Sequence, residues 1–156
     1  MNIKTERLLL IPCTREYIRK NENAGYEFGP HVEYYLENLQ QDNTQYGWGV
    51  WFVELKEDGT TIGDVGFKGK PTEEGTVEIG YGISPNVQNK GYATESVDAL
   101  IQWAFSTEAV TRIIAECLED NTPSIKVLKK LGMELVGKDG MMLKWEMSRG
   151  DKQLGA

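Results

Sequence analysis

A short run of polar and small residues between a predicted strand and a predicted helix has the composition of an anion-binding turn. The run is Gln88-Asn89-Lys90-Gly91-Tyr92-Ala93, and it follows an apolar stretch over residues 77–83. The first N–H groups of a helix lack partners within the helix, and the helix dipole makes that end partially positive. A phosphate placed there accepts these hydrogen bonds, and Gly91 lets the backbone approach it closely. The turn is a candidate phosphate cradle, although a solvated polar turn can have the same composition.

The strand before this turn is predicted to have one apolar face and one nearly bare face. Side chains alternate along residues 76–84, so the apolar side chains fall together on one side. The other side holds Glu78, Gly80, Gly82 and Ser84. Two glycines beside one carboxylate leave room for a small molecule, which makes Glu78 a candidate site residue. A solvated strand glutamate would show the same pattern.

The other segments predict one α+β domain around these residues, since a chain of 156 residues has room for a single core. Short apolar or alternating runs bounded by turn residues predict strands over 7–11, 48–55, 61–67, 76–84, 112–118, 133–137 and 141–147. Period-3.6 patterns and capping residues predict helices over 32–42, 93–105 and 122–131. Asp58-Gly59 predicts a hairpin between the second and third strands. We expect the domain to span residues 1–150, with a C-terminal tail at 151–156.

Composition excludes several classes of function. The formal net charge of −7 argues against nucleic acid as a partner. No apolar run reaches the length of about 20 residues that spans a membrane. Cys13 and Cys117 are far apart and are expected to be reduced, which favours a cytoplasmic location. We expect no metal site, because His31 is the single histidine, and we interpret it as a polar residue near a cleft rather than a base.

Several motifs in order resemble the GNAT superfamily of N-acetyltransferases, and within it the RimJ/RimL-like group (Acetyltransf_3 type). These motifs are Thr5-Glu6-Arg7-Leu8, Glu78-Ile79-Gly80-Tyr81, the 88–93 turn with Thr94-Glu95, Asn121-Thr122-Pro123-Ser124, and Lys130-Leu131-Gly132-Met133. The resemblance implies a twisted, mostly antiparallel sheet of about six or seven strands, with about four flanking helices. It also implies that the fourth and fifth strands splay apart to admit acetyl-CoA, the cosubstrate.

The resemblance assigns roles to individual residues. It implies that Gln88, Asn89, Lys90, Gly91, Tyr92 and Ala93 hold the pyrophosphate of acetyl-CoA. The backbone near Ile83 and Ser84 would hold its acyl end, and Asn121 would bind the pantetheine amides. The resemblance also implies a primary amine as the acceptor, and we hypothesise that this amine lies over Gly80 and Gly82 while Glu78 takes its proton.

The leaving thiolate needs a proton, and the usual tyrosine donor is absent. The position that holds this tyrosine in many relatives is occupied by Leu128. The RimL-type pattern implies Ser124 as the substitute, and water is the alternative. Asn121 and Ser124 can also be read as ordinary turn and first-turn residues.

Three functions remain open on the sequence alone. The first is acetylation of a protein or peptide α-amine, and the second is acetylation of a small cationic amine such as a polyamine, amino acid or aminoglycoside. The third is a non-catalytic acyl-CoA-binding module, which the missing tyrosine suggests. We expect no membrane or nucleic-acid partner and either a monomer or a homodimer, because an exposed sheet edge can pair two subunits.

Overall fold

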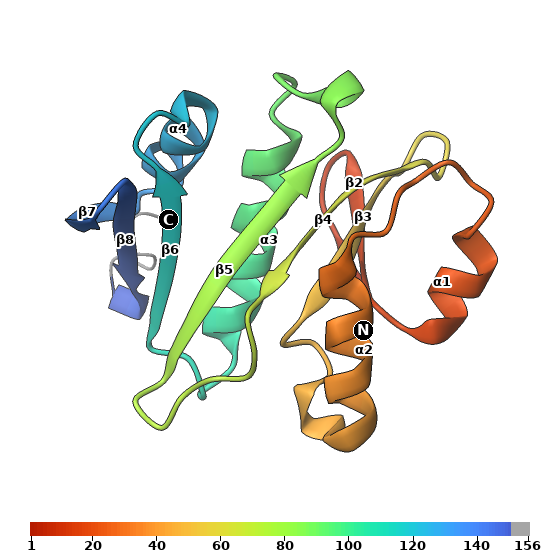
Figure 1. Ribbon diagram of the computed structural model, residues 1–156, viewed down its shortest axis with the longest axis horizontal. Helices are drawn as coiled ribbons and strands as arrows, with labels where there is room; N and C mark the ends of the chain where they lie inside the picture. The colour runs from red at the N-terminus through yellow and green to blue at the C-terminus, as the bar shows by residue number, and fades with distance from the viewer. Residues whose placement is uncertain (151–156) are drawn as a thin grey trace.

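The computed structural model describes residues 1–150, in which the strands form one mixed sheet of eight strands in the order β1-β2-β3-β4-β5-β6-β8-β7 (Figure 1). Its strands are β1 (Ile3–Lys4), β2 (Leu8–Pro12), β3 (Val50–Leu55), β4 (Thr61–Phe67), β5 (Thr76–Ile83), β6 (Arg112–Leu118), β7 (Glu134–Asp139) and β8 (Met142–Ser148). The α-helices within these residues are α1 (Arg15–Asn21), α2 (Pro30–Gln41), α3 (Tyr92–Ser106) and α4 (Thr122–Lys130). The tail predicted at 151–156 lies outside the described residues.

The sheet opens into two arms at β5 and β6. These strands are parallel and pair only from Thr76 opposite Arg112 to Glu78 opposite Ile114. All other neighbouring strands are antiparallel. Figure 1 shows β5 and β6 diverging toward the top of the view, with α3 behind the sheet and α4 beside β6. The predicted splay is confirmed, and it falls between the fifth and sixth strands because the two-residue β1 precedes the first predicted strand.

Two apolar cores lie on opposite faces of the sheet. The larger packs α3 and α4 against the strands and includes fully buried Trp51, Leu100 and Ile113. The smaller packs α1 and α2 against the other face, around Phe52 and Tyr35. Strand β3 is buried on both faces, so its sequence reads as a continuous apolar run rather than an alternation.

The predicted elements agree with the observed ones to within a few residues, but the two-residue strand β1 and helix α1 were not predicted. This helix has seven residues and buries only Tyr17, so it has too short an apolar stripe to recognise by periodicity. Its local signal is the Thr14 side chain, which accepts a hydrogen bond from the Tyr17 N–H at 3.1 Å and caps the helix. A search of residues 1–150 finds no helix with the length and apolar content to cross a membrane.

Candidate functional site

The predicted phosphate cradle lies at the N-terminus of α3, at the open end of the gap between β5 and β6 (Figure 1). A short 3-10 helix, Pro85–Val87, leads out of β5, and the Gln88 side chain donates to the Ile83 carbonyl at 2.9 Å. Asn89 and Gly91 both adopt the left-handed region, with φ of 64° and 83°. Gly91 is the N-cap of α3 and has no side chain to satisfy the first N–H groups. These donors remain available to an anion, as at other helix N-termini that bind phosphate.

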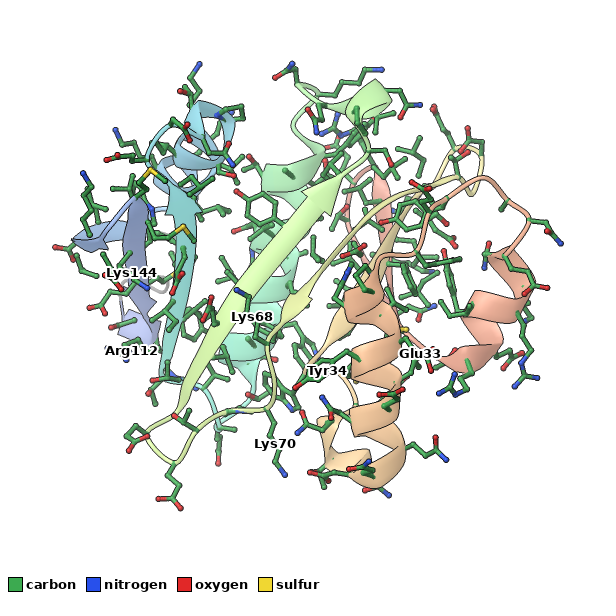
Figure 2. The ribbon with its side chains drawn as sticks, in the orientation of Figure 1. Glu33, Tyr34, Lys68, Lys70, Arg112 and Lys144 are labelled. Atoms are coloured by element: carbon green, nitrogen blue, oxygen red, sulfur yellow. The ribbon has the colours of Figure 1, made fainter. Side chains whose placement is uncertain are left out.

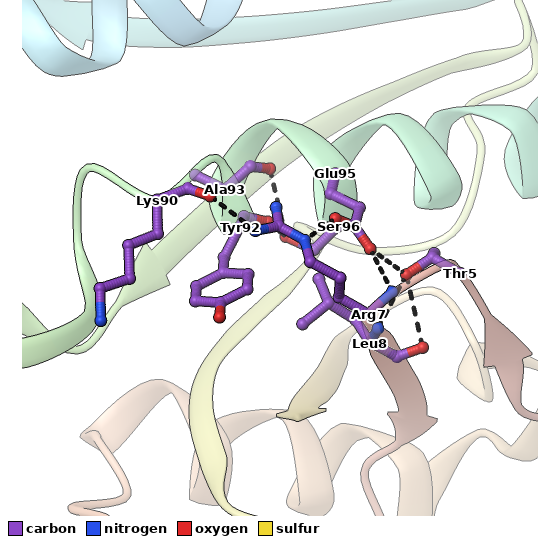
Figure 3. A network of polar contacts seen from close by, with 8 residues as sticks. All are labelled: Thr5, Arg7, Leu8, Lys90, Tyr92, Ala93, Glu95 and Ser96. Atoms are coloured by element: carbon purple, nitrogen blue, oxygen red, sulfur yellow. Dashed lines mark hydrogen bonds and ion pairs between the residues drawn. The ribbon is translucent and has the colours of Figure 1, made fainter. Parts of the chain in front are cut away.

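A network of hydrogen bonds ties the cradle to the start of β2 (Figure 3). The Glu95 carboxylate accepts from the Thr5 hydroxyl at 2.5 Å, from the Arg7 N–H at 2.9 Å and from Arg7 Nε at 2.7 Å. Arg7 also donates to the Lys90 carbonyl at 2.9 Å, and its guanidinium lies 4.4 Å from the centre of the Tyr92 ring. Burial alone would raise the pKa of Glu95, but the hydrogen bonds from Thr5 and Arg7 outweigh it and lower that pKa. Thr5 and Arg7 of the Thr-Glu-Arg-Leu motif therefore fix the position of the cradle relative to β2.

The gap itself begins where β5 and β6 stop pairing, and Ile83 and Ser84 lie beyond that point. The Ser84 N–H donates to the Ile62 carbonyl at 2.7 Å. It is therefore not a free oxyanion donor. Antiparallel pairing of β4 with β5 continues through Gly63 and Ile83.

Asn121 and Ser124 lie on the opposite side of the gap, at the start of α4. The Asn121 side chain caps the helix by accepting from the Ser124 N–H at 3.2 Å. The Ser124 hydroxyl is close enough to the Tyr81 phenol to lower its pKa, although burial has the larger effect and raises it. Leu128 is 1% exposed and belongs to the larger core. Asn121 thus caps α4 through its side-chain oxygen, and its amide N–H groups remain for a ligand.

A cavity of about 1240 Å³ covers the other face of β4 and β5. Its floor is made of glycines, since Gly66 pairs with Gly80 and Gly82 lies opposite Asp64. A Cβ added at Gly82 would meet no atom within 4 Å. Aromatic side chains, Tyr26, Tyr34, Tyr35 and Trp48, form much of the remaining lining. The bare face predicted from the sequence is therefore the floor of an open cavity.

Asp64 is the principal carboxylate at one end of this floor, and the sequence analysis did not single it out. Tyr26 donates to its Oδ2 at 2.6 Å, and Nε2 of His31 lies 2.9 Å from its Oδ1. The Asp64 side chain is 15% exposed, and all three residues line the cavity. Burial, with the hydrogen bond to Asp64, raises the pKa of Tyr26. His31 lies next to the cavity, as predicted, and it helps to hold a carboxylate there.

Glu78 lies just past the other end of the floor and does not line the cavity. Its carboxylate accepts from Lys68 Nζ at 2.7 Å, and its side chain is 23% exposed. Figure 2 shows Lys68 over β5, with Tyr34 extending from α2 toward the same space. Lys68 lines the cavity and separates it from Glu78. The two predicted catalytic residues, Glu78 and Ser124, thus lie on opposite faces of β5.

Within residues 1–150 no three His, Cys, Asp or Glu side chains are grouped so that they could hold a metal ion. The donors that the site offers are backbone N–H groups, hydroxyls and amides, which suit phosphate and amide oxygens. The Asp64 and Glu78 carboxylates lie on the cavity side of the sheet.

The chain matches known proteins over most of its length. Residues 12–134 match the family model described as an acetyltransferase (GNAT) domain. The uncharacterized N-acetyltransferase YjdG of Bacillus subtilis (strain 168) is 36% identical over 129 residues, which is 83% of this chain and 77% of that protein.

Two proteins that act on ribosomal proteins are more distant. The ribosomal-protein-serine acetyltransferase of Escherichia coli (strain K12) is 30% identical over 93 residues, covering 60% of this chain and 51% of that protein. The solved structure of RimL, a ribosomal L7/L12 alpha-N-protein acetyltransferase in complex with coenzyme A, superimposes with a TM-score of 0.75. That match covers 95% of this chain and 98% of the other at 16% identity, so it shows a common fold.

Proposed function

This chain belongs to the GNAT acetyltransferase family as a RimJ/RimL-like member, and from that premise we propose that it acetylates the α-amine of a protein or peptide with acetyl-CoA. Family membership makes it an N-acetyltransferase. The acceptor class and the roles of individual residues are our proposal. In this proposal the protein binds acetyl-CoA and the acceptor together, and the amine attacks the acetyl group directly.

We choose a peptide as the acceptor because of the size of the cavity over β4 and β5. Sites for drug-sized molecules commonly enclose about 300–1,000 Å³. A cavity of about 1240 Å³, open to solvent and lined by tyrosines, has room for several residues of a peptide end. The relative that acetylates a ribosomal-protein serine supports the same class of acceptor.

The cradle at α3 supports acetyl-CoA as the donor. The N–H groups of the 88–93 turn and the first turn of α3 would hold the pyrophosphate, and the exposed Lys90 ammonium adds a screened positive charge. From there the pantetheine arm would enter the gap between β5 and β6, where the free amide of Asn121 faces it. The acyl end would then reach β5 near Ile83 and Ser84.

The cost of deprotonating the acceptor favours an α-amine over a lysine side chain. At pH 7 an α-amine of pKa about 8 costs about 1.4 kcal/mol to deprotonate, whereas a lysine of pKa about 10.4 costs about 4.6 kcal/mol. We assign Asp64 the role of attracting the acceptor ammonium to the glycine floor. Glu78 then takes one proton through a water, since Lys68 lies between its carboxylate and the cavity. The neutral amine attacks the thioester carbon, its nitrogen loses a second proton to solvent water, and the C–S bond breaks.

Two measurements on the purified protein test this function. Calorimetric titration with acetyl-CoA should show saturable binding, and Gly91→Asp should weaken it by adding a negative charge to the cradle. Gly59→Asp is a matched control, because Gly59 also has positive φ, at 75°, but lies in the β3–β4 turn. Full donor affinity in Gly91→Asp would move the donor site elsewhere.

The acceptor is tested by incubating the protein with acetyl-CoA and a panel of peptides, half of them blocked at the N-terminus. Mass spectrometry should find acetyl groups on free α-amines and none on blocked peptides. Transfer to lysine side chains of the blocked peptides would contradict the α-amine assignment.

A small cationic amine is the second candidate acceptor, and the carboxylates of Asp64 and Glu27 in the cavity lining favour it. Parallel assays with a polyamine, free amino acids and an aminoglycoside distinguish it from the peptide. The non-catalytic alternative rests on buried Leu128 in the usual tyrosine position. Binding of acetyl-CoA without transfer to any amine in either panel would support that alternative.

Compartment and assembly stay predictions from the sequence. Cys13 and Cys117 are both free and buried, and burial raises the pKa of the Cys13 thiol to about 12. Such a thiol is unreactive, which agrees with the proposed cytoplasmic location. Either a monomer or a homodimer is compatible with the exposed edge strand β7.

A further inference from the structure

The buried hydroxyl of Tyr81 makes no hydrogen bond in the free protein, although the Ser124 hydroxyl lies near enough to affect its pKa. Within residues 1–150 its Oη is one of two buried side-chain polar atoms that make no hydrogen bond, the other being Nε1 of Trp145. Leaving a buried hydroxyl unsatisfied costs about 1–3 kcal/mol. A cost of that size at the centre of a site suggests that the hydroxyl has a partner when ligand is present.

Tyr81 lies at the gap between the two arms of the sheet. It is three residues beyond Glu78, the last residue of β5 that pairs with β6, which places it about 10 Å along the strand from the end of pairing. Its side chain is on the face of β5 that packs against the larger core. The charged or polar groups that influence its phenol are Ser124 on α4 and Cys117 on β6. The ring therefore extends from β5 toward the far side of the gap.

We propose that the Tyr81 hydroxyl hydrogen-bonds the sulfur of the acetyl donor and protonates the thiolate as it leaves. The inference rests on the proposed function, because it needs a thioester in the gap. It assigns to a strand residue the task that the tyrosine missing at position 128 performs in many relatives. Leu128 cannot share this task, because its side chain is apolar and buried in the core.

The proton balance of the step is simple. When the tetrahedral intermediate collapses, the C–S bond breaks and its electron pair stays on sulfur. The proton on Tyr81 Oη moves to that sulfur, and the phenolate regains a proton through the Ser124 hydroxyl from solvent water, which in turn takes up the second proton released by the acceptor nitrogen. Burial keeps the phenol protonated until then, and the same desolvation disfavours a bare thiolate in the gap.

Tyr81→Phe tests the contact with sulfur because it keeps the ring and removes only the hydroxyl. The free protein should be as stable as the wild type or more stable, since the hydroxyl that is lost had no partner. Wild-type protein should bind CoA about tenfold more tightly than desulfo-CoA, and Tyr81→Phe should bind the two equally. With acetyl-CoA and an acceptor, kcat should fall about a hundredfold, the low end for a general acid.

Two further variants separate a role in catalysis from a role in structure. Tyr17→Phe is the matched control, because the Tyr17 hydroxyl bonds Glu54 and Thr61, both at 2.6 Å, away from the gap. It should lose stability and keep both kcat and the preference for CoA. Ser124→Ala should lower kcat in the wild type and have no further effect in Tyr81→Phe, because both residues act on one proton.

The outcomes separate this inference from the proposed function. Wild-type kcat in Tyr81→Phe together with an unchanged preference for CoA would overturn the inference and leave the acetyltransferase intact. The wild type could prefer CoA to desulfo-CoA, and Tyr81→Phe could abolish that preference, while the wild type acetylates no amine. That result would support the contact with sulfur and refute the proposed transfer. Absence of donor binding would overturn both.

Discussion

Filling the floor of the cavity at Gly82 is the most direct way to locate the acceptor. A Cβ at this position would meet no atom within 4 Å, and the φ of Gly82 is not positive, so alanine or valine fits the backbone. Glycine inside a strand costs about 0.5–1 kcal/mol relative to alanine. In a chain of this length we therefore expect Gly82→Ala to raise Tm by about 1–4 °C.

Activity should change in the opposite direction. The new side chain occupies the place where the acceptor amine is proposed to lie, and a displacement of about 1 Å can cost about a hundredfold in rate. We expect kcat/KM for the acceptor to fall about a hundredfold in Gly82→Val, equivalent to about 2.7 kcal/mol, with a smaller loss in Gly82→Ala. The affinity for acetyl-CoA should not change, because the cradle lies beyond the end of β5.

The assay is steady-state release of CoA, measured at saturating acetyl-CoA with varied acceptor. Gly137→Val is the control, since a Cβ at Gly137 also meets nothing within 4 Å but lies on β7, away from the cavity. A Gly82→Val protein whose kcat/KM stays within twofold of the wild type would refute the placement of the acceptor on this floor.

Substitutions at three other residues test the remaining parts of the site. Glu95→Ala removes the acceptor of three hydrogen bonds from Thr5 and Arg7, so urea denaturation should show a loss of about 2 kcal/mol and calorimetry a weaker affinity for acetyl-CoA. Because the folded-state pKa of Glu95 is lowered, its contribution to stability is present above its unfolded pKa of about 4.3 and is lost as pH falls through the folded value. The difference in Tm between wild type and Glu95→Gln should therefore shrink between pH 5 and pH 3, and a constant difference would contradict this role. Glu78→Gln should lower kcat about a hundredfold and change the acid limb of the pH–rate profile, whereas an unchanged profile would remove Glu78 as the base. Leu128→Ala should cost about 3 kcal/mol of stability without changing kcat of the folded protein, and a specific loss of kcat would give this residue a part in the chemistry.

Local features of the fold and the donor site could be predicted from the sequence. Alternation along residues 76–84 predicted the glycine floor, because the two faces of a strand are fixed by its period. The helix N-terminus with free N–H groups at 88–93 was predictable, because glycine before a helix and the orphan N–H groups are both local properties, whereas phosphate binding there stays a prediction.

Contacts between distant residues could not be predicted in the same way. Asp64 meets His31 across 33 positions and Tyr26 across 38, and no pattern along the chain records these pairs. The signal that could have found Asp64 is its position inside a strand, where aspartate is uncommon, on the same face as Gly66. The Tyr81 hydroxyl is likewise defined by its lack of a partner, which only a three-dimensional arrangement reveals.

If the 88–93 turn holds the donor as proposed, the contacts of Arg7 with Glu95 and the Lys90 carbonyl couple the beginning of the chain to donor affinity. The same contacts order the start of β2 and the 88–93 turn. Ordering one segment therefore favours ordering the other. Donor binding should therefore slow hydrogen exchange at the N-terminal strands, far from the sulfur. By the same reciprocity, an affinity tag fused before Met1 can change the apparent affinity for the donor. The dissociation constant of acetyl-CoA should therefore be measured on tag-free protein.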